Sequence, residues 1–318
     1  MNKTLDELKI VVVIPCYKVE NHIEEVIDTL PDFVSGIVCV NDCSPDSSGK
    51  LLDLIAERDS RLTVVHHEQN LGVGGAMLTG YAKARELGAD ILVKMDGDGQ
   101  MDPAHMRELI EPILAGRADF SKGNRFRDFT ALREMPLSRR IGNLGLTFLI
   151  KAASGYWNMF DPTNGYTAIR GETMDKLPTK RIHNTYFFET SLIMELYYMN
   201  AVIEDVPIPA RYGDEVSGLS RTRTLFEFPP KLLFGFFRRL ILKYYLIDFN
   251  MGSVYWLFGI PLFVAGCWMG LVNFFKYASS GVGAPTGTVV IPALLIILGF
   301  QLILAALSVD LENYPRKR

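Results

Sequence analysis

The sequence predicts an α/β protein with a doubly wound, mostly parallel sheet, followed by an amphipathic helix at a membrane interface and two transmembrane helices. Two patterns in the 318 residues indicate this arrangement. Short apolar runs alternate with helical patterns between residues 9 and 122, which is typical of a parallel sheet with helices on both faces. Near the C-terminus, residues 252–309 carry a single charged side chain, that of Lys276.

The alternating part of the chain predicts a series of strands and helices. The strands are short runs of apolar and β-branched residues, at residues 9–14, 36–40, 62–66, 91–95 and 119–122. The helices follow amphipathic patterns, at residues 21–29, 48–59, 75–86 and 103–114. In a sheet of this kind, ligands bind beyond the carboxyl ends of the strands. The polar motifs of the sequence fall at those ends.

Two apolar segments predict membrane spans. Residues 252–275 and 288–309 are uncharged, and at about 1.5 Å per residue each exceeds the roughly 30 Å hydrocarbon core of a bilayer. A buried hairpin in a globular core is the alternative, but globular helices rarely run this long without a charge. Basic residues flank the outer ends, at 238–243 and 316–318. By the positive-inside rule, both termini and the N-terminal body face the cytoplasm, at the cytoplasmic membrane or, in a eukaryote, at the ER membrane.

Residues 232–249, just before the first span, combine aromatic and basic side chains. This composition predicts a helix in the headgroup layer, with an ordinary amphipathic surface helix as the alternative. The dipeptide Pro229-Pro230 indicates the joint between the body and the membrane part. The expected organisation is therefore a globular cytoplasmic domain at 1–228, an interfacial helix at 229–250, and a two-helix anchor with a short cytoplasmic tail at 251–318.

Charge and cysteine usage exclude other classes. The net charge of −3 argues against a nucleic-acid binder, because no overall positive field would attract a polyphosphate. The pair Cys39 and Cys43 is disfavoured as a metal site, since no second pair completes four ligands. The apolar run that ends at Pro15 is too short for a signal peptide and predicts a buried strand.

Asp96 and Asp98 follow the apolar run at 91–95 and form the strongest single motif. Residues i and i+2 of a strand point to the same side, and two adjacent carboxylates repel each other unless a cation lies between them. Hard oxygen ligands suit Mg²⁺ or Mn²⁺, which in turn bridge phosphate oxygens. The alternative is a glycine-rich acidic turn. The position at a strand end favours a metal site.

Two further motifs predict contacts to a nucleotide. Asp42 follows the second strand and could accept hydrogen bonds from a base or ribose, whereas Asp46 or Ser47 could cap the next helix. The loop from Gly72 to Gly75 suggests a dinucleotide fingerprint, but Met77 occupies the position of its last glycine and the loop follows the third strand rather than the first. The loop is instead expected to pass close under a nucleotide and to begin a helix.

In their order along the chain, four motifs resemble those of family 2 glycosyltransferases with the GT-A fold. The motifs are Ile-Pro-Cys-Tyr at 14–17, Asn-Asp-Cys-Ser-Pro-Asp at 41–46, Asn-Leu-Gly at 70–72 and Asp-Gly-Asp-Gly-Gln at 96–100. More narrowly, residues 8 to about 215 resemble the polyprenyl-phosphate glycosyltransferases, which include dolichol-phosphate mannose synthase and bacterial undecaprenyl-phosphate sugar transferases. The resemblance implies metal-dependent, inverting transfer of a sugar from a UDP- or GDP-linked donor to undecaprenyl or dolichyl phosphate. It also implies a homo-oligomer, plausibly a tetramer.

The resemblance assigns roles to individual positions. The donor-binding residues would be Pro15, Tyr17, Glu20, Asp42, Gly72 and Asp96. The metal ligands would be Asp96, Asp98 and Gln100, using Mg²⁺ or Mn²⁺. The acceptor phosphate would be bound by Arg125, Arg139 or Arg140, and Arg211, so that Asp96, Asp98 and Arg125 form the catalytic set. Guanidinium groups suit phosphate oxygens on physical grounds alone, and a solvated surface charge is the alternative for each arginine.

The sequence departs from the family pattern in two places. The family often ends its catalytic domain with an Arg, a Gly and a Ser-Lys pair in close order. In residues 211–217 these positions lie farther apart, and no lysine follows Ser217, which weakens the assignment of Arg211. Gly97 is smaller than the alanine often found between the two acids. A phosphate acceptor is already an anion and requires no strong base, and Asp161 and Glu189 are the plausible base candidates if one were needed.

Two rival functions remain. A processive polysaccharide synthase of the same superfamily would carry a Gln-x-x-Arg-Trp motif, whereas none of the tryptophans at 157, 256 and 268 follows an arginine. A catalytically idle membrane-bound binder of nucleotide sugars would not need the intact acids Asp96 and Asp98. The identity of the sugar, and UDP against GDP, stay open at this stage.

Overall fold

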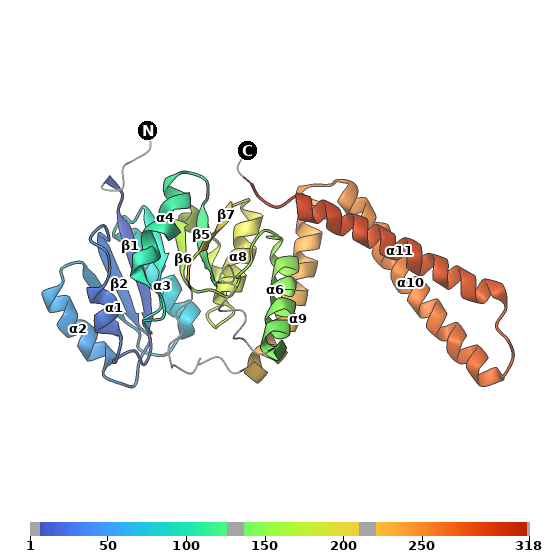
Figure 1. Cartoon of the computed structure of the whole chain (residues 1–318), viewed down its shortest axis with the longest axis horizontal. Helices are drawn as coiled ribbons and strands as arrows, with labels where there is room; N and C mark the ends of the chain where they lie inside the picture. Colours follow the sequence, from blue (N-terminus) through green and yellow to red (C-terminus); the bar gives the residue numbers. More distant parts are fainter. Residues whose placement is uncertain (1–6, 126–136, 210–220, 317–318) are drawn as a thin grey trace. The chain divides into compact units, whose positions relative to one another are not determined.

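The computed structural model describes residues 7–125, 137–209 and 221–316, and the chain forms two compact units that divide after Gly235. The first unit contains a seven-stranded sheet in the order β3-β2-β1-β4-β6-β5-β7 (Figure 1). The strands are β1 (Ile10–Cys16), β2 (Gly36–Asn41), β3 (Leu62–His66), β4 (Ile91–Lys94), β5 (Phe120–Asn124), β6 (Thr167–Arg170) and β7 (Ile203–Pro207). The predicted α/β class is thereby confirmed, and each expected strand is found within two residues of its expected ends.

The pairing of β6 distinguishes this sheet from a wholly parallel one. Strands β1 to β4 pair in parallel, as do β5 and β7, but β6 runs antiparallel to both of its neighbours, β4 and β5. Lys94 and Lys122 both pair with Thr167, the first residue of β6. The segment that precedes β6 therefore lies at the same edge of the sheet as the residues that follow β4 and β5.

Helices cover both faces of the sheet. They are α1 (Ile23–Asp28), α2 (Ser48–Arg58), α3 (Gly72–Glu86), α4 (Met106–Leu114), α6 (Leu137–Ser154), α7 (Gly171–Asp175) and α8 (Phe188–Tyr198), with short 3₁₀ turns η2 (Pro103–His105) and η4 (Thr179–Arg181). Helices α1, α2 and α4 share one hydrophobic core with alternate residues of β1, such as Val12 and Ile14. Helix α3 packs on the opposite face, where a Cβ at Gly80 would overlap the side chain of Val13.

Several elements were not expected from the sequence. These are β6, β7, α6, α7 and α8. Strand β6 has only four residues, Thr-Ala-Ile-Arg, and β7 mixes Glu204 and Asp205 with its apolar positions, as edge strands often do. Helix α3 begins at Gly72, three residues before its expected start.

The second unit, residues 236–314, begins within helix α9 and contains the two long apolar helices. Helix α9 (Arg221–Ile241) continues into a π-helical turn, η5 (Leu242–Ile247), and is followed by α10 (Met251–Ser280) and α11 (Thr286–Glu312). Pro229 and Pro230 lie inside α9, so the joint expected there is not a break in the helix. The predicted boundaries of the three segments stay predictions.

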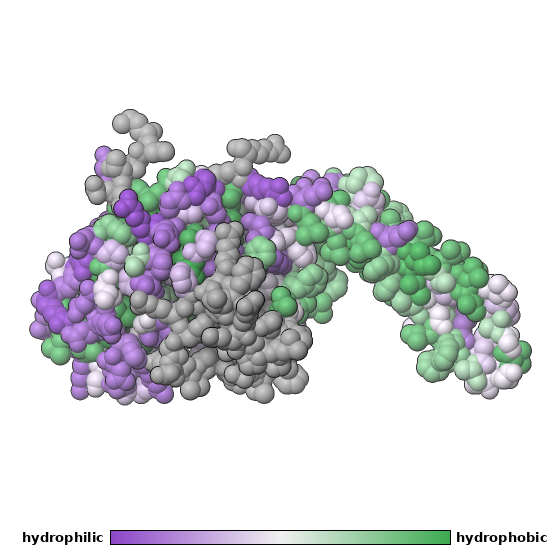
Figure 2. Space-filling view, viewed as in Figure 1, coloured by the Kyte–Doolittle hydropathy of each residue, from purple (hydrophilic) through white to green (hydrophobic). Residues whose placement is uncertain are grey.

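Helices α10 and α11 are long and apolar enough to cross a membrane. Only 11% and 17% of their most apolar windows are buried, which is the reverse of what a core helix of a soluble protein shows. Figure 2 shows the hydrophobic surface along this hairpin. The two helices approach closely, because a Cβ at Gly299 would lie 2.4 Å from the backbone nitrogen of Phe263. Small residues at such crossings are typical of membrane helices.

A buried ion pair joins α9 to the end of α11 within the second unit. Arg239 Nη1 and Nη2 lie 2.6 and 2.8 Å from the two carboxylate oxygens of Asp310, and the Tyr244 hydroxyl donates to Asp310 Oδ1 at 2.7 Å. The side chains of Arg239 and Asp310 are 1% and 0% exposed. The sequence placed Arg239 among cations at the lipid surface, and this was wrong, because its charge is paired inside the unit.

Candidate active site

Expected residues of both the donor site and the acceptor site lie at the carboxyl ends of strands, at one edge of the sheet. Pro15 is near the end of β1, Asp42 follows β2, Asp96 follows β4 and Arg125 follows β5, while Gly72 begins α3. Because β1, β2 and β4 are parallel neighbours, their carboxyl ends meet at this edge, which is where ligands bind in open α/β sheets.

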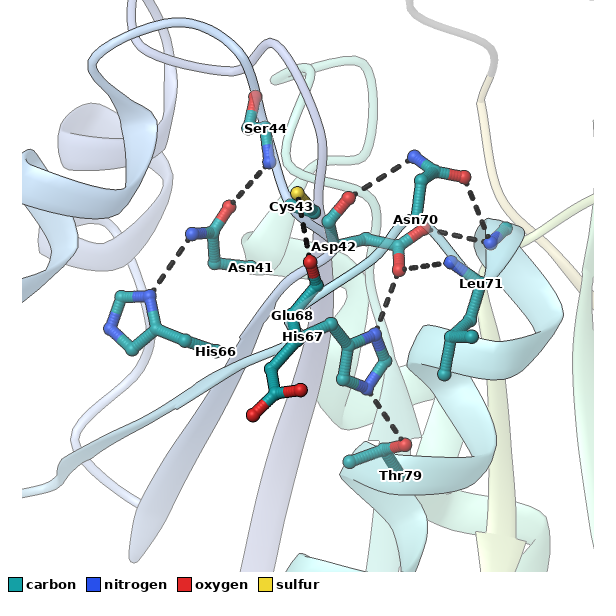
Figure 3. A network of polar contacts seen from close by, with 11 residues as sticks. Asn41, Asp42, Cys43, Ser44, His66, His67, Glu68, Asn70, Leu71 and Thr79 are labelled. Carbon is teal, nitrogen blue, oxygen red and sulfur yellow. Dashed lines mark hydrogen bonds and ion pairs between the residues drawn. The ribbon is translucent and has the colours of Figure 1, made fainter.

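The Asp42 carboxylate organises the start of α3 (Figure 3). It accepts hydrogen bonds from the backbone nitrogens of Leu71 and Gly72, each at 2.8 Å, and its Oδ1 lies 2.7 Å from His67 Nδ1. The other ring nitrogen of His67 lies 3.0 Å from Thr79 Oγ1. An anion at a helix N-terminus is favourable, and Asp42 is only 3% exposed. Its contact with a nucleotide stays a prediction.

The glycine-rich loop approaches another part of the chain closely. Gly72 has a φ of +81°, and a Cβ there would lie 2.6 Å from the carbonyl oxygen of Asn184. The same carbonyl accepts a hydrogen bond from the Gly74 nitrogen at 2.8 Å. The glycines therefore permit a backbone contact with the segment before α8. The expected passage under a nucleotide is untested.

Glu20, between β1 and α1, and Asp46, just before α2, both accept hydrogen bonds from the start of α2. Glu20 Oε2 accepts from the Ser47 nitrogen at 2.8 Å, and Asp46 Oδ1 accepts from the Ser48 nitrogen at 3.1 Å. These contacts satisfy amides of the first turn of α2, which agrees with the capping role expected of Asp46. Tyr17 is 46% exposed, so its ring is accessible to a ligand.

The loop after β4 presents oxygen ligands. The Asp96 carboxylate is 33% exposed, and Asp98 Oδ1 accepts from the Gln100 nitrogen at 3.0 Å. A Cβ at Gly165 would lie 2.8 Å from Asp96 Oδ2, so the absence of a side chain there leaves room for this carboxylate. Within 7–125, 137–209 and 221–316, no three His, Cys, Asp or Glu side chains already converge on one point.

These residues nevertheless fit a Mg²⁺ or Mn²⁺ ion that also binds a diphosphate. Two carboxylates and one amide oxygen are hard donors, as such ions prefer. Three protein ligands leave other positions of an octahedral ion for phosphate oxygens and water. An ion held by these residues would therefore need ligands from a bound substrate.

Lys94 and Glu189 belong to this site and were not expected there together. Lys94 is 1% exposed, and its Nζ lies 2.6 Å from Asp96 Oδ1 and 3.3 Å from Glu189 Oε1 of α8. Burial by itself would lower the pKa of Lys94, but the carboxylates of Asp96 and Glu189 raise it above its ordinary value. The signal in the sequence was a lysine inside an otherwise apolar strand, two residues before Asp96.

Arg125 is held by Asp161 from the segment before β6. Its Nε lies 2.8 Å from Asp161 Oδ2, its Nη2 lies 3.1 Å from Oδ1, and its backbone nitrogen also donates to Oδ2. Asp161 is fully buried and Arg125 is 38% exposed. A buried carboxylate engaged through both oxygens is not placed to take a proton from a substrate. Asp161 therefore orients an arginine rather than acting as a base.

For the other three arginines expected on the acceptor side, the structure does not describe the side chains. Arg139 and Arg140 lie in the first turn of α6, but the described side chains do not include theirs. Arg211 lies outside the described residues. Their roles stay predictions.

Asp205 of β7 contacts Asn124, the residue before Arg125, and its burial predicts a pH effect on stability. Burial raises its pKa to about 6, although its Oδ2 accepts from the Phe160 nitrogen at 2.6 Å. Because the folded state holds this proton more tightly than the unfolded state, the stability contribution is present near pH 4 and is lost as the pH rises through 6. Asp205→Asn is therefore expected to raise stability at pH 7.5 by on the order of 1 kcal/mol.

The measurement is thermal melting of the full chain in detergent between pH 5 and 7.5. The gap between the Asp205→Asn variant and wild type should widen with pH. The neighbouring Glu204→Gln, which alters an exposed side chain paired with Arg117, should keep the wild-type pH profile. Parallel profiles for Asp205→Asn and wild type would contradict the assignment.

Comparison with known proteins gives one family match. Residues 11–177 match the family described as Glycosyl transferase family 2. The chain is 32% identical over 222 residues to a UDP-N-acetylglucosamine–dolichyl-phosphate N-acetylglucosaminyltransferase of Methanococcus voltae, covering 64% of this chain and 86% of that protein. It is 28% identical over 204 residues to an undecaprenyl-phosphate mannosyltransferase of Micrococcus luteus, covering 63% and 83%.

A solved structure supports the fold. Glucosyl-3-phosphoglycerate synthase from Mycobacterium tuberculosis, in complex with Mn²⁺, UDP-glucose and phosphoglyceric acid, aligns with a TM-score of 0.53 at 22% identity. The alignment covers 75% of this chain and 84% of that one. The expected GT-A architecture is therefore confirmed.

Proposed function

The chain belongs to glycosyl transferase family 2, and from this we propose that it transfers a sugar from a nucleotide sugar to the phosphate of a polyprenyl phosphate. The observation that carries the proposal is the union of this fold with two exposed apolar helices of membrane-spanning length. A lipid acceptor is the substrate that explains why a catalytic unit would be tethered to a bilayer. The two relatives named for transfer to dolichyl or undecaprenyl phosphate support this acceptor class.

On the donor side, the chain would bind a UDP- or GDP-sugar at the edge of the sheet. Asp96, Asp98 and Gln100 would hold Mg²⁺ or Mn²⁺, an ion that neutralises the diphosphate as it leaves. The exposed ring of Tyr17 would contact the base. Pro15, Glu20, Asp42 and Gly72 complete the donor site that the family resemblance implies.

On the acceptor side, Arg125 would bind the lipid phosphate. Asp161 fixes the plane of its guanidinium through two nitrogens, and such a preorganised fork suits phosphate oxygens. The phosphate is already anionic, so it attacks the anomeric carbon without a base as the bond to the nucleoside diphosphate breaks. A single displacement inverts the anomeric centre. Arg139, Arg140 and Arg211 remain further candidates for the same phosphate.

The membrane topology follows from the flanking charges. We place the catalytic unit and both termini on the cytoplasmic side, because basic residues cluster at 238–243 and 316–318, outside the two spans, whereas the stretch between the spans carries only Lys276. The expected segments are 1–228, 229–250 and 251–318, and the expected assembly is a homo-oligomer, plausibly a tetramer.

The test is a transfer assay with the purified full chain in detergent. The protein is incubated with undecaprenyl or dolichyl phosphate, Mg²⁺ or Mn²⁺, and UDP-glucose, UDP-N-acetylglucosamine or GDP-mannose in turn. The expected product is a polyprenyl-phosphate monosaccharide with inverted configuration, and chelation by EDTA should abolish it. A polymer would favour a processive synthase, nucleotide-sugar binding without product would favour an idle binder, and retained configuration would exclude the single displacement.

Arg125→Lys is expected to weaken acceptor binding selectively. Lysine keeps the charge beside the buried Asp161 but cannot form the two-nitrogen contact with it. The KM for polyprenyl phosphate should rise about 10-fold, while the KM for the donor changes little. Arg107→Lys on the exposed surface of α4 serves as the control. Equal changes in the KM values for donor and acceptor would show that Arg125 does not bind the acceptor specifically.

A further inference from the structure

Lys94 is buried beneath the loop that carries the metal-binding acids. Its neighbours along the chain, Val93 of β4 and Met95 just after it, belong to the core with α1, α2 and α4. Because side chains alternate across a strand, Lys94 points to the opposite face, toward α3 and α8. Asp96, two residues on, continues on the same side as Lys94.

The ammonium group of Lys94 is paired with two carboxylates from different parts of the fold. It lies 2.6 Å from Asp96 Oδ1 and 3.3 Å from Glu189 Oε1, and Glu189 is 18% exposed. Glu189 is in the first turn of α8. A single buried cation thus connects the loop after β4 with a helix that follows it by almost one hundred residues.

The backbone at Gly165 closes this arrangement from a third side. A Cβ there would lie 2.5 Å from Lys94 Nζ and 2.8 Å from Asp96 Oδ2. The Lys94 ammonium group is therefore packed between the segment before β6 and α8. The Asp96 carboxylate is held by this ammonium group and bounded on one side by Gly165, while its remaining surface is open to a ligand.

The charge of Lys94 is buried among other charged groups. Its ammonium group faces the carboxylates of Asp96 and Glu189, and the buried Lys122 also interacts electrostatically with Glu189 and Lys94. Burying an ammonium costs several kcal/mol, and an apolar residue in its place is often as stable. Retaining a charged side chain here requires an explanation other than stability.

We propose that Lys94 is a positioning residue of the donor site, which fixes Asp96 for the divalent cation and couples that carboxylate to Glu189 of α8. The inference rests on the proposed function, because it assigns Asp96 to the metal. Partners that orient a metal ligand are worth about 10-fold to 100-fold in metal affinity. Lys94 would act through Asp96 and not by touching the substrate.

The test is a double-mutant cycle read by Mn²⁺ binding. Free Mn²⁺ is measured by electron paramagnetic resonance, with UDP in one series and GDP in another, for wild type, Lys94→Met, Asp96→Asn and the double variant. Lys94→Met is expected to weaken Mn²⁺ binding about 10-fold and to have less than about a 2-fold effect in the Asp96→Asn background. The control is Arg85→Met, which breaks the ion pair between Arg85 of α3 and Asp175 of α7. This variant should bind Mn²⁺ as wild type does.

Kinetics supply a second readout. Lys94→Met should raise the Mn²⁺ requirement and the donor KM, and leave the KM for polyprenyl phosphate unchanged. If Lys94→Met folds poorly, Lys94→Gln, which retains a polar group, is expected to show the same pattern. The positioning role is overturned if Lys94→Met binds Mn²⁺ as tightly as wild type or more tightly, or if it causes an equal loss in both backgrounds. The proposed function is unaffected by these outcomes as long as the wild-type protein binds Mn²⁺. Failure of wild type to bind Mn²⁺ with either nucleotide overturns the metal assignment and this inference together.

Discussion

Replacing Asp98 by alanine is expected to lower kcat/KM for sugar transfer about 1,000-fold, with the protein still folded. Asp98 lies in the turn after β4, where its Oδ1 accepts a hydrogen bond from the Gln100 nitrogen of the same turn, and the melting temperature of the variant checks that it is folded. The loss should come from the missing oxygen ligand, because the leaving diphosphate would no longer be neutralised. Initial rates with the donor varied below its KM, at fixed saturating acceptor and Mn²⁺, measure the effect.

Asp53→Ala is the matched control. Asp53 is an exposed acid on α2 that contacts His66, and its removal changes the net charge by the same amount. Transfer by this variant should equal that of wild type. If Asp98→Ala retained most of its activity, the metal site would have to lie elsewhere. Binding of nucleotide sugar by a wild type that never turns over would instead favour the idle binder.

Replacing Asp310 by asparagine is expected to destabilise the second unit by about 3 kcal/mol. The change leaves the Arg239 guanidinium without its carboxylate, although that side chain is only 1% exposed. Tyr244 would also lose its charged acceptor. Breaking a buried pair from one side costs more than removing the pair, because one charge stays buried. Thermal melting of the detergent-solubilised full chain measures the loss.

Two variants make this result specific. Ser308→Ala removes an exposed hydroxyl of α11 that donates to the carbonyl of Leu304, and it should melt close to wild type. The double variant Arg239→Met with Asp310→Leu replaces both charges by apolar groups and should recover most of the loss. A single Asp310→Asn variant that melts like wild type would show that the pair contributes little to the unit.

The sequence was informative where local pattern decides structure. Strands β1 to β4 are short apolar runs rich in β-branched residues, and the two apolar helices are longer than is usual in globular proteins, so both were recognisable without tertiary contacts. Strand β6 was not, because Thr-Ala-Ile-Arg has neither the length nor the alternation that identifies a strand. Its antiparallel place between β4 and β5 depends on pairing partners far along the chain.

The same distinction applies to the site. The acids after β4 could be recognised from their position at a strand end, whereas the pairing of Arg125 with Asp161 joins residues 36 positions apart. Asp161 was expected to be a candidate base, and only its burial and its contacts identify it as the partner of an arginine. Arg239 was likewise misjudged, since a basic residue near a span resembles a surface charge until its partner 71 positions away is known.

The reversed direction of β6 limits how this enzyme could be recombined with its relatives. A chimera that exchanged the chain from β4 through Arg125, the residue after β5, would separate Asp96 from Gly165 and Arg125 from Asp161. Both β4 and β5 hydrogen-bond to β6, so an exchanged fragment would have to continue past residue 170 to remain self-consistent. Donor and acceptor preferences would therefore be inherited as one block and not as two interchangeable parts.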